Sequence, residues 1–87
     1  MYERIKVPTA FTKNGFRFYF WSNEENRAHI HVDKGDGNAK YWLRPAISQK
    51  FSYGYTTREI SKIEELIIEN YNELITKWDE HIEKKNS

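Results

Sequence analysis

Two histidines stand at a spacing that could support acid–base chemistry. His29 and His31 lie in the segment 28–33, which reads AHIHVD. Residues i and i+2 of an extended strand point to the same face, so we expect the two imidazoles to lie side by side. Histidine titrates near neutral pH, and such a pair could serve as general base and general acid in RNA cleavage. His29 and His31 are therefore the catalytic candidates.

The same histidine pair has two other interpretations. It could supply two metal ligands, with Asp33 on the same face as a third, but a closed zinc site needs four ligands and a catalytic one about three. Since nothing else in the sequence converges on the pair, we expect no metal. The two imidazoles could also make only structural hydrogen bonds beside the turn that follows them.

Cationic and aromatic residues are expected on the same sheet face as the histidines. In the segments 16–21 and 39–44, alternation places apolar residues on one face and Arg, Lys, Trp and Tyr residues on the other. The members of this predicted binding face are Arg17, Tyr19, Trp21, Lys40, Trp42 and Arg44. Because a large exposed aromatic patch usually marks a contact surface, we expect this face to bind a partner.

Three explanations of the binding face stay open. Single-stranded RNA or DNA could stack its bases on the rings and bring its phosphates to the cations. A protein partner could use the same Trp, Tyr and Arg side chains as anchors. Alternatively, residues 1–12 or 46–55 could fold over the face and bury it.

The first part of the chain has the pattern of strands joined by turns. The predicted strands span 16–21, 28–33 and 39–44. Asn14-Gly15 predicts a turn before the first strand, and the glycines of 34–38 predict a hairpin turn between the second and the third. Residues 2–8 are expected to form an edge strand or an extended arm. We expect residues 46–55 to form a helical turn followed by a loop.

From Thr56 onward the hydrophobic period changes from 2 to 3.6. Thr56 and Glu59 have the spacing of a capping box, in which each side chain satisfies the other residue's backbone amide. Apolar residues then recur every three or four positions, which predicts one helix over 57–84. The recurring positions are Ile60, Ile63, Ile67, Tyr71, Leu74, Trp78 and Ile82.

These elements predict a single α+β domain over 1–87. A three- to four-stranded antiparallel meander sheet is expected to pack on one long C-terminal α-helix. The predicted core consists of Phe16, Phe18, Phe20, Ile30, Val32, Tyr41 and Leu43 from the strands and Ile63, Ile67, Leu74 and Trp78 from the helix.

The composition excludes several classes of protein. The chain has no cysteine, which excludes disulfides and thiolate metal sites. It shows no signal-peptide pattern and no apolar run of about 18 residues, so we expect a cytoplasmic protein without membrane contact. No Gly-rich phosphate loop precedes a helix, and we expect no cofactor. Residues 1–55 carry a net charge of +4 and 56–87 a net charge of −3, so two copies could pair as a homodimer.

Four segments, taken in order, resemble the bacterial domain-of-unknown-function 4160 family. They read GFRFYFWSNE from Gly15, HIHV from His29, KGDGNAKYWL from Lys34 and YGYTTREISKIEELIIENYNELITKW ending at Trp78. The chain departs from the family at Arg27-Ala28, where many relatives have prolines, and it carries an additional N-terminal arm. The resemblance implies a small, often stand-alone bacterial protein encoded in toxin–antitoxin-like gene pairs. It implies no established activity.

Within this resemblance, His29 and His31 match the family's histidine pair, and Lys40 and Trp42 match its Lys-aromatic-Trp strand. We therefore expect a small protein of uncharacterised function that serves as a protein- or RNA-binding module of a toxin–antitoxin-like two-gene system. Its partner would be a small protein encoded by the neighbouring gene, or RNA, bound through the sheet face of these residues.

The alternative function is that of a metal-independent ribonuclease toxin. His29 and His31 would form its acid–base pair, and Arg17, Lys40 or Arg44 would stabilise the charge of the phosphorane. A two-histidine metal site is a third hypothesis. Whether the protein is an enzyme stays open.

Overall fold

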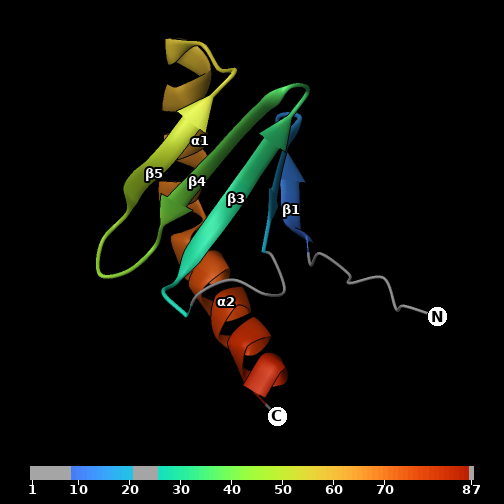
Figure 1. Ribbon diagram of the computed structural model, residues 1–87, viewed down its shortest axis with the longest axis vertical. Helices are drawn as coiled ribbons and strands as arrows, with labels where there is room; N and C mark the ends of the chain where they lie inside the picture. Colours follow the sequence, from blue (N-terminus) through green and yellow to red (C-terminus); the bar gives the residue numbers. More distant parts are fainter. Residues whose placement is uncertain (1–8, 21–25, 87) are drawn as a thin grey trace, which may run out of the picture.

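The computed structural model describes residues 9–20 and 26–86, with side chains described as far as residue 83. Within these residues the chain forms five strands followed by two helices (Figure 1). The elements are β1 (Thr9–Lys13), β2 (Phe16–Tyr19), β3 (His29–Lys34), β4 (Gly37–Trp42), β5 (Ser48–Tyr53), α1 (Thr57–Glu69) and α2 (Tyr71–Asn86). The strands pair antiparallel in the order β1-β2-β3-β4-β5. The predicted α+β class and antiparallel meander are confirmed.

Two tight turns join strands where the glycine pattern predicts them. Asn14 and Gly15 connect β1 to β2 with φ angles of 54° and 82°. Positive φ at both central residues is what a type I′ hairpin turn requires, and it matches the twist of the flanking strands. Gly35, with φ 57°, lies in the turn between β3 and β4. The Asn14-Gly15 turn is confirmed, and a turn is confirmed between the second and third predicted strands.

The β3–β4 turn is shorter than the predicted 34–38, and this shifts both strands. Pairing continues as far as Lys34 on β3 and Gly37 on β4, so only two residues remain in the turn. The predicted strands 28–33 and 39–44 therefore differ from the observed strands by one or two residues at each end.

The described sheet has five strands rather than the three or four expected. The prediction fell short because the edge strands carry little hydrophobic signal. β5 lies within 46–55, so the predicted helical turn and loop are wrong. Every residue of β5 except Ser52 is exposed, and a bulge in its pairing with β4 interrupts the period of two. β1 buries only Ala10. The predicted edge strand or arm over 2–8 lies outside the described residues.

The helix predicted over 57–84 is interrupted at Asn70, so the correct number is two. α1 begins at the predicted capping box, where Glu59 N donates to Thr56 Oγ1 at 3.1 Å and Thr56 N donates to Glu59 Oε1 at 2.9 Å. Asn70 has φ −113° and ψ 22°, and its Nδ2 donates to the carbonyl oxygen of Leu66 at 2.8 Å. Asparagine side chains compete with the backbone for such hydrogen bonds, which disfavours a continuous helix. The apolar spacing does not register this interruption, because α2 resumes at the next residue.

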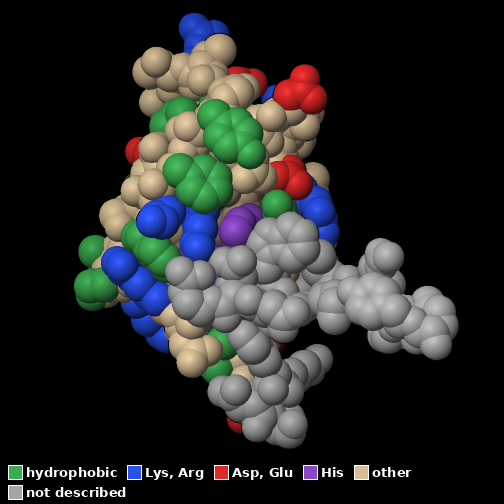
Figure 2. All heavy atoms as spheres, in the orientation of Figure 1, with side chains coloured by type: hydrophobic (Ala, Val, Ile, Leu, Met, Phe, Trp, Pro, Cys, Tyr) green, Lys and Arg blue, Asp and Glu red, His purple; other side chains and the backbone are tan. Residues whose placement is uncertain are grey.

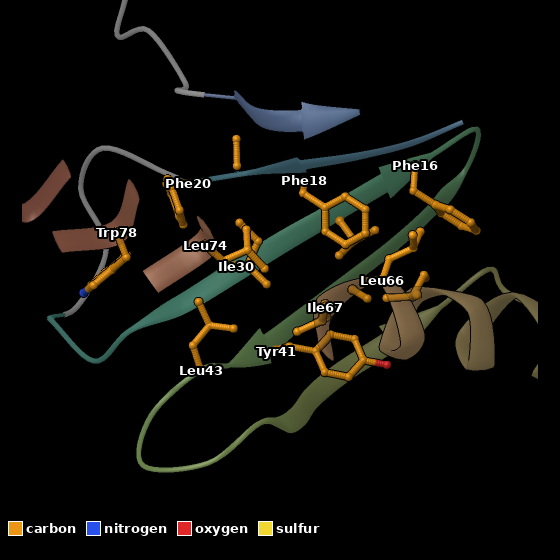
Figure 3. Packing of buried hydrophobic residues seen from close by; sticks show 14 of the residues in the cluster. Phe16, Phe18, Phe20, Ile30, Tyr41, Leu43, Leu66, Ile67, Leu74 and Trp78 are labelled. Carbon is orange, nitrogen blue, oxygen red and sulfur yellow. The ribbon is translucent and has the colours of Figure 1, made fainter. Parts of the chain in front are cut away.

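Both helices cover one face of the sheet (Figure 1), and the predicted core lies between the helices and the sheet. Figure 3 shows the sheet side chains Phe18, Ile30 and Tyr41 beside Ile67 and Leu74 of the helices. All predicted core residues are at least 97% buried. No helix in the described part of the chain is long and apolar enough to cross a membrane. The face opposite the helices, called the outer face here, carries the two histidines.

Candidate functional site

The predicted site residues meet on the outer face through cross-strand pairing. His31 is paired with Tyr19 on β2 and with Lys40 on β4, and His29 is paired with Trp42 on β4. Side chains of directly opposite residues lie on the same face and contact each other. The structure therefore brings these five predicted residues into one cluster.

The two imidazoles lie side by side, with ring centroids 5.3 Å apart and an interplanar angle of 82°. Both are buried: His29 is 0% exposed and His31 is 5% exposed. The Nδ1 atom of His29 lies 2.6 Å from the carbonyl oxygen of Arg27. Because a carbonyl only accepts, this hydrogen bond requires a proton on Nδ1, and it orients the ring through the chain segment just before β3.

Aromatic rings enclose both histidines. The Tyr19 ring stacks on His31 with centroids 5.3 Å apart and planes 24° apart. Trp78 of α2 lies 4.9 Å from His29 and 5.8 Å from His81, measured between ring centroids. The sequence predicts Trp78 as a core residue and assigns no role to His81, although their i, i+3 spacing places them on one side of a helix. All three histidines of the chain thus belong to one set of ring contacts.

A polar network lies beside this cluster on β2, β3 and β4. Asp33 accepts hydrogen bonds from the Tyr19 hydroxyl, at 3.2 Å, and from Asn38 Nδ2. Burial raises the pKa of Tyr19, an effect to which the nearby Asp33 carboxylate adds and which the hydrogen bond with Asn38 opposes. Arg17 lies with its Cζ 4.5 Å from the Tyr19 ring centroid, and its Nε donates to Thr9 Oγ1 at 2.9 Å. These contacts fix the hydroxyl end of Tyr19.

Two cations surround the half-buried indole of Trp42. Arg27 Cζ lies 4.2 Å and Lys40 Nζ 4.8 Å from a Trp42 ring centroid, distances typical of cation–π contacts. Arg27 lies in the polar stretch before β3, and the alternation pattern does not single it out. Trp42 therefore holds one guanidinium and one ammonium group rather than offering an open ring face.

Open ring faces occur further along the outer face, on β5. Phe51 is 38% exposed and Tyr53 is 61% exposed, and their rings stack with centroids 6.1 Å apart and planes 10° apart. Phe51 is paired with Lys40 across β4, and the bulge leaves Lys50 as an exposed extra residue beside it. Sequence reasoning missed both rings because it expected no strand here.

Figure 2 shows this side of the molecule, with hydrophobic rings next to Lys and Arg side chains. We call this set of residues the aromatic–cationic strip. Its members are Arg27, Lys40, Trp42, Lys50, Phe51 and Tyr53. The strip runs from the segment just before β3 across β4 to β5, and cations lie beside the rings along it.

Residues 15–79 of the chain match the family described as Domain of unknown function (DUF4160). The chain belongs to this family. The matched region extends from the β1–β2 turn into α2, so it includes both sheet histidines and the whole aromatic–cationic strip. No curated protein and no solved structure matches the chain. Since the description of the DUF4160 family states no activity, the function has to be argued from the site.

One predicted face residue of this DUF4160 chain does not join the cluster. Arg44 lies beyond the end of β4, and its guanidinium donates to both carboxylate oxygens of Asp79 on α2, at 3.0 and 3.1 Å. This hydrogen bonding raises the pKa of Arg44. The prediction extended strand alternation past Trp42, where the strand ends, and so assigned Arg44 to the wrong surroundings. Trp21 lies outside the described residues.

The described residues of this DUF4160 chain contain no group of three or more His, Cys, Asp or Glu side chains arranged to hold a metal. Asp33, the expected third ligand, is engaged by Tyr19 and Asn38. Folding of 46–55 over the outer face is also ruled out, because β5 lies beside β4 in the sheet. The arrangement thus combines buried imidazoles with exposed rings and cations.

Proposed function

We propose that this DUF4160 protein is a binding module that holds single-stranded RNA on its aromatic–cationic strip. The observation that carries the proposal is the exposed, parallel pair of rings formed by Phe51 and Tyr53. Bases stack on aromatic side chains with a gain of about 1–3 kcal/mol each, and this stacking tolerates many sequences. Two exposed rings on an edge strand provide such a platform.

The cations of the strip supply the second requirement of RNA binding. Lys50 lies exposed in the bulge beside Phe51, and Arg27 lies exposed at the far side of Trp42. Lys40 is buried opposite Phe51 and adds positive charge from within the sheet. Positive charge beside stacked rings attracts the phosphates of a strand whose bases lie on the rings. Trp42 contributes by holding the side chains of Arg27 and Lys40 in place.

A protein partner is the competing occupant of the same strip. Trp, Tyr and Arg are common interface anchors, but protein interfaces are depleted in lysine. The exposed Lys50 next to two exposed rings, with the charge of Lys40 beneath them, therefore favours RNA. A role in a toxin–antitoxin-like gene pair is compatible with either occupant, and the partner encoded by the neighbouring gene is an outcome of the test below.

The ribonuclease hypothesis ranks second because of the burial of the histidines. His29 is 0% exposed and His31 is 5% exposed, and His29 Nδ1 is bound to the Arg27 carbonyl. An acid–base pair has to lie within hydrogen-bond reach of the atoms that exchange protons. The exposed surface that an RNA strand can reach is formed by Phe51 and Tyr53 instead.

The test is a titration of a short, fluorescently labelled single-stranded RNA of mixed sequence with the full chain, followed by anisotropy. With the two exposed cations Arg27 and Lys50 contacting phosphates, affinity should fall roughly sevenfold between about 50 and 200 mM salt. A duplex of the same sequence should bind more weakly, because its bases are already stacked. Equal binding of the duplex, or no response to salt, would contradict the proposal.

Two further readouts separate the alternatives in the same samples. A gel after the titration should show intact RNA, whereas cleavage that the His29→Ala/His31→Ala variant loses would make the ribonuclease hypothesis the better one. Capture from the host with the tagged chain should recover RNA that nuclease treatment removes. Capture of the small neighbouring-gene protein, unaffected by nuclease, together with no binding of pure RNA would establish the protein partner instead.

A further inference from the structure

An open cavity of about 690 Å³ lies where the start of β3, the end of β4 and the start of α2 meet. It adjoins the Arg27 end of the aromatic–cationic strip. Its lining residues are Asn26, Arg27, Ala28, Arg44, Pro45 and Tyr71. The cavity is broad and open, and its lining includes two guanidinium groups whose hydrogen bonding differs.

The Arg44 guanidinium is already paired with a carboxylate of the same chain. Both of its terminal nitrogens donate to the carboxylate of Asp79, so its charge is neutralised within the cavity wall. The Tyr71 hydroxyl likewise donates to the carbonyl oxygen of Leu43, at 2.6 Å. These two groups shape the cavity and leave recognition of an anion to Arg27.

Arg27 is held in position by two contacts that leave its fork available. Its Nε donates to the carbonyl oxygen of Arg44 at 2.9 Å, and its Cζ lies 4.2 Å from the Trp42 ring. With the described residues, its two terminal nitrogens make no hydrogen bond or ion pair. The side chain is exposed, so these nitrogens are accessible from solvent.

We propose that Arg27 forms a phosphate-binding subsite at this cavity. The planar fork of a guanidinium matches two oxygens of a phosphate group, and such charge-assisted, bidentate hydrogen bonds are about twice as strong as neutral ones. Stacking on Trp42 and the bond to Arg44 orient the fork in advance, which reduces the entropy lost on binding. The exposed amide of Asn26 lines the same cavity and can donate to a third oxygen.

As a subsite of the strip, the inference rests on the proposed function. Phe51 and Tyr53 would hold bases, while the Arg27 cavity would hold a phosphate of the same strand. Along β4, the distance from Asn38, opposite Tyr53, to Trp42 is four residues, or about 13 Å at 3.3 Å per residue. The phosphate could equally belong to a small phosphorylated ligand, and the chemistry of the subsite is the same.

The test is a pair of titrations on the full chain, with the variant Arg27→Gln and the control Arg58→Gln. Arg58 is an exposed arginine in the first turn of α1, so its replacement removes the same charge away from the cavity. In NMR spectra of arginine Nε–H groups, inorganic phosphate should shift the Arg27 signal, and an equal ionic strength of chloride should not. In the RNA titration, Arg27→Gln should lose about tenfold in affinity, and Arg58→Gln less than about twofold.

The outcomes separate the subsite from the proposed function. RNA binding that is unchanged in Arg27→Gln, with no phosphate shift, would overturn the subsite and leave RNA binding on the rings intact. A phosphate shift in a chain that binds no RNA would support the subsite and overturn the proposed function. In that case, titration with a nucleoside monophosphate in place of the RNA identifies the small-ligand source. Circular dichroism of both variants should match the wild type, because the Arg27 side chain is exposed.

Discussion

Both faces of β3 and β4 contain buried side chains, but the two faces differ in chemistry. On the inner face, Ile30 is 0% exposed and Tyr41 is 1% exposed, and both contact the apolar residues of the helices. On the outer face, His29 is 0% exposed and Lys40 is 7% exposed, yet their neighbours are rings, carbonyls and other polar groups. Burial alone therefore does not distinguish the apolar face from the polar one.

The two faces differ in how far they are covered by other parts of the chain. The inner face is closed along its described length by α1 and α2. The outer face continues onto β5, where Phe51 and Tyr53 are exposed beside Lys50. The buried histidine cluster and the exposed ring pair therefore differ in accessibility. Under the proposed function, the first orients the strip and the second provides the surface for RNA.

The largest expected effect concerns the inner face. Ile30→Ala should lower the free energy of unfolding by about 3 kcal/mol, because it removes a fully buried side chain and leaves a cavity. RNA affinity per folded molecule should stay unchanged. Urea denaturation measures the first quantity and anisotropy the second. A comparable variant of an exposed apolar residue, Ile68→Ala, should change neither by much.

A second prediction uses the alkaline pH range to probe the inner face. Burial and the nearby Glu64 carboxylate raise the pKa of Tyr41 to about 12, a shift opposed by the hydrogen bond with Gln49. The unfolded chain ionises first as the pH rises above 10, so the stability contributed by the neutral hydroxyl is full below pH 10 and is lost toward pH 12. Tyr41→Phe should flatten this decline by about 2 kcal/mol relative to wild type. Parallel curves for the two proteins in chemical denaturation would contradict this assignment.

The smallest expected effect separates the two arginines of the cavity. Arg44→Gln removes an exposed pair with Asp79, and exposed pairs contribute little to stability. RNA affinity should change by less than about twofold, since the charge of Arg44 is already neutralised by Asp79. A loss as large as that of Arg27→Gln would show that the strip extends to Arg44. Strand alternation alone predicts that extension.

Much of the fold could be predicted because local signals agree with tertiary structure. The alternation around Ile30 and Val32, the Asn14-Gly15 turn and the Thr56–Glu59 capping box each depend on residues close in sequence. The same locality explains why the histidine pair could be placed on one face. The family likewise could be recognised from consecutive motifs.

The remaining features depend on contacts that local patterns do not encode. No residue of β5 is fully buried, so its sequence has no clear hydrophobic alternation. The position of its two rings follows only from its pairing with β4. The interruption at Asn70 arises from a side-chain hydrogen bond to Leu66 within an unbroken apolar spacing. The contact of His29 with Trp78 joins residues that are far apart in the sequence. These long-range contacts determine which part of the outer face stays exposed.

The most direct test of the account compares two double variants in the same RNA titration. Phe51→Ala/Tyr53→Ala removes the exposed rings, and His29→Asn/His31→Asn removes the buried imidazoles; thermal melts identify the samples that are folded. If His29→Asn/His31→Asn does not fold, His31→Asn replaces it. The account predicts that the ring variant loses about 30-fold in affinity and the histidine variant less than about threefold. The reverse order, with intact binding by the ring variant and loss in a folded histidine variant, would contradict the central claim.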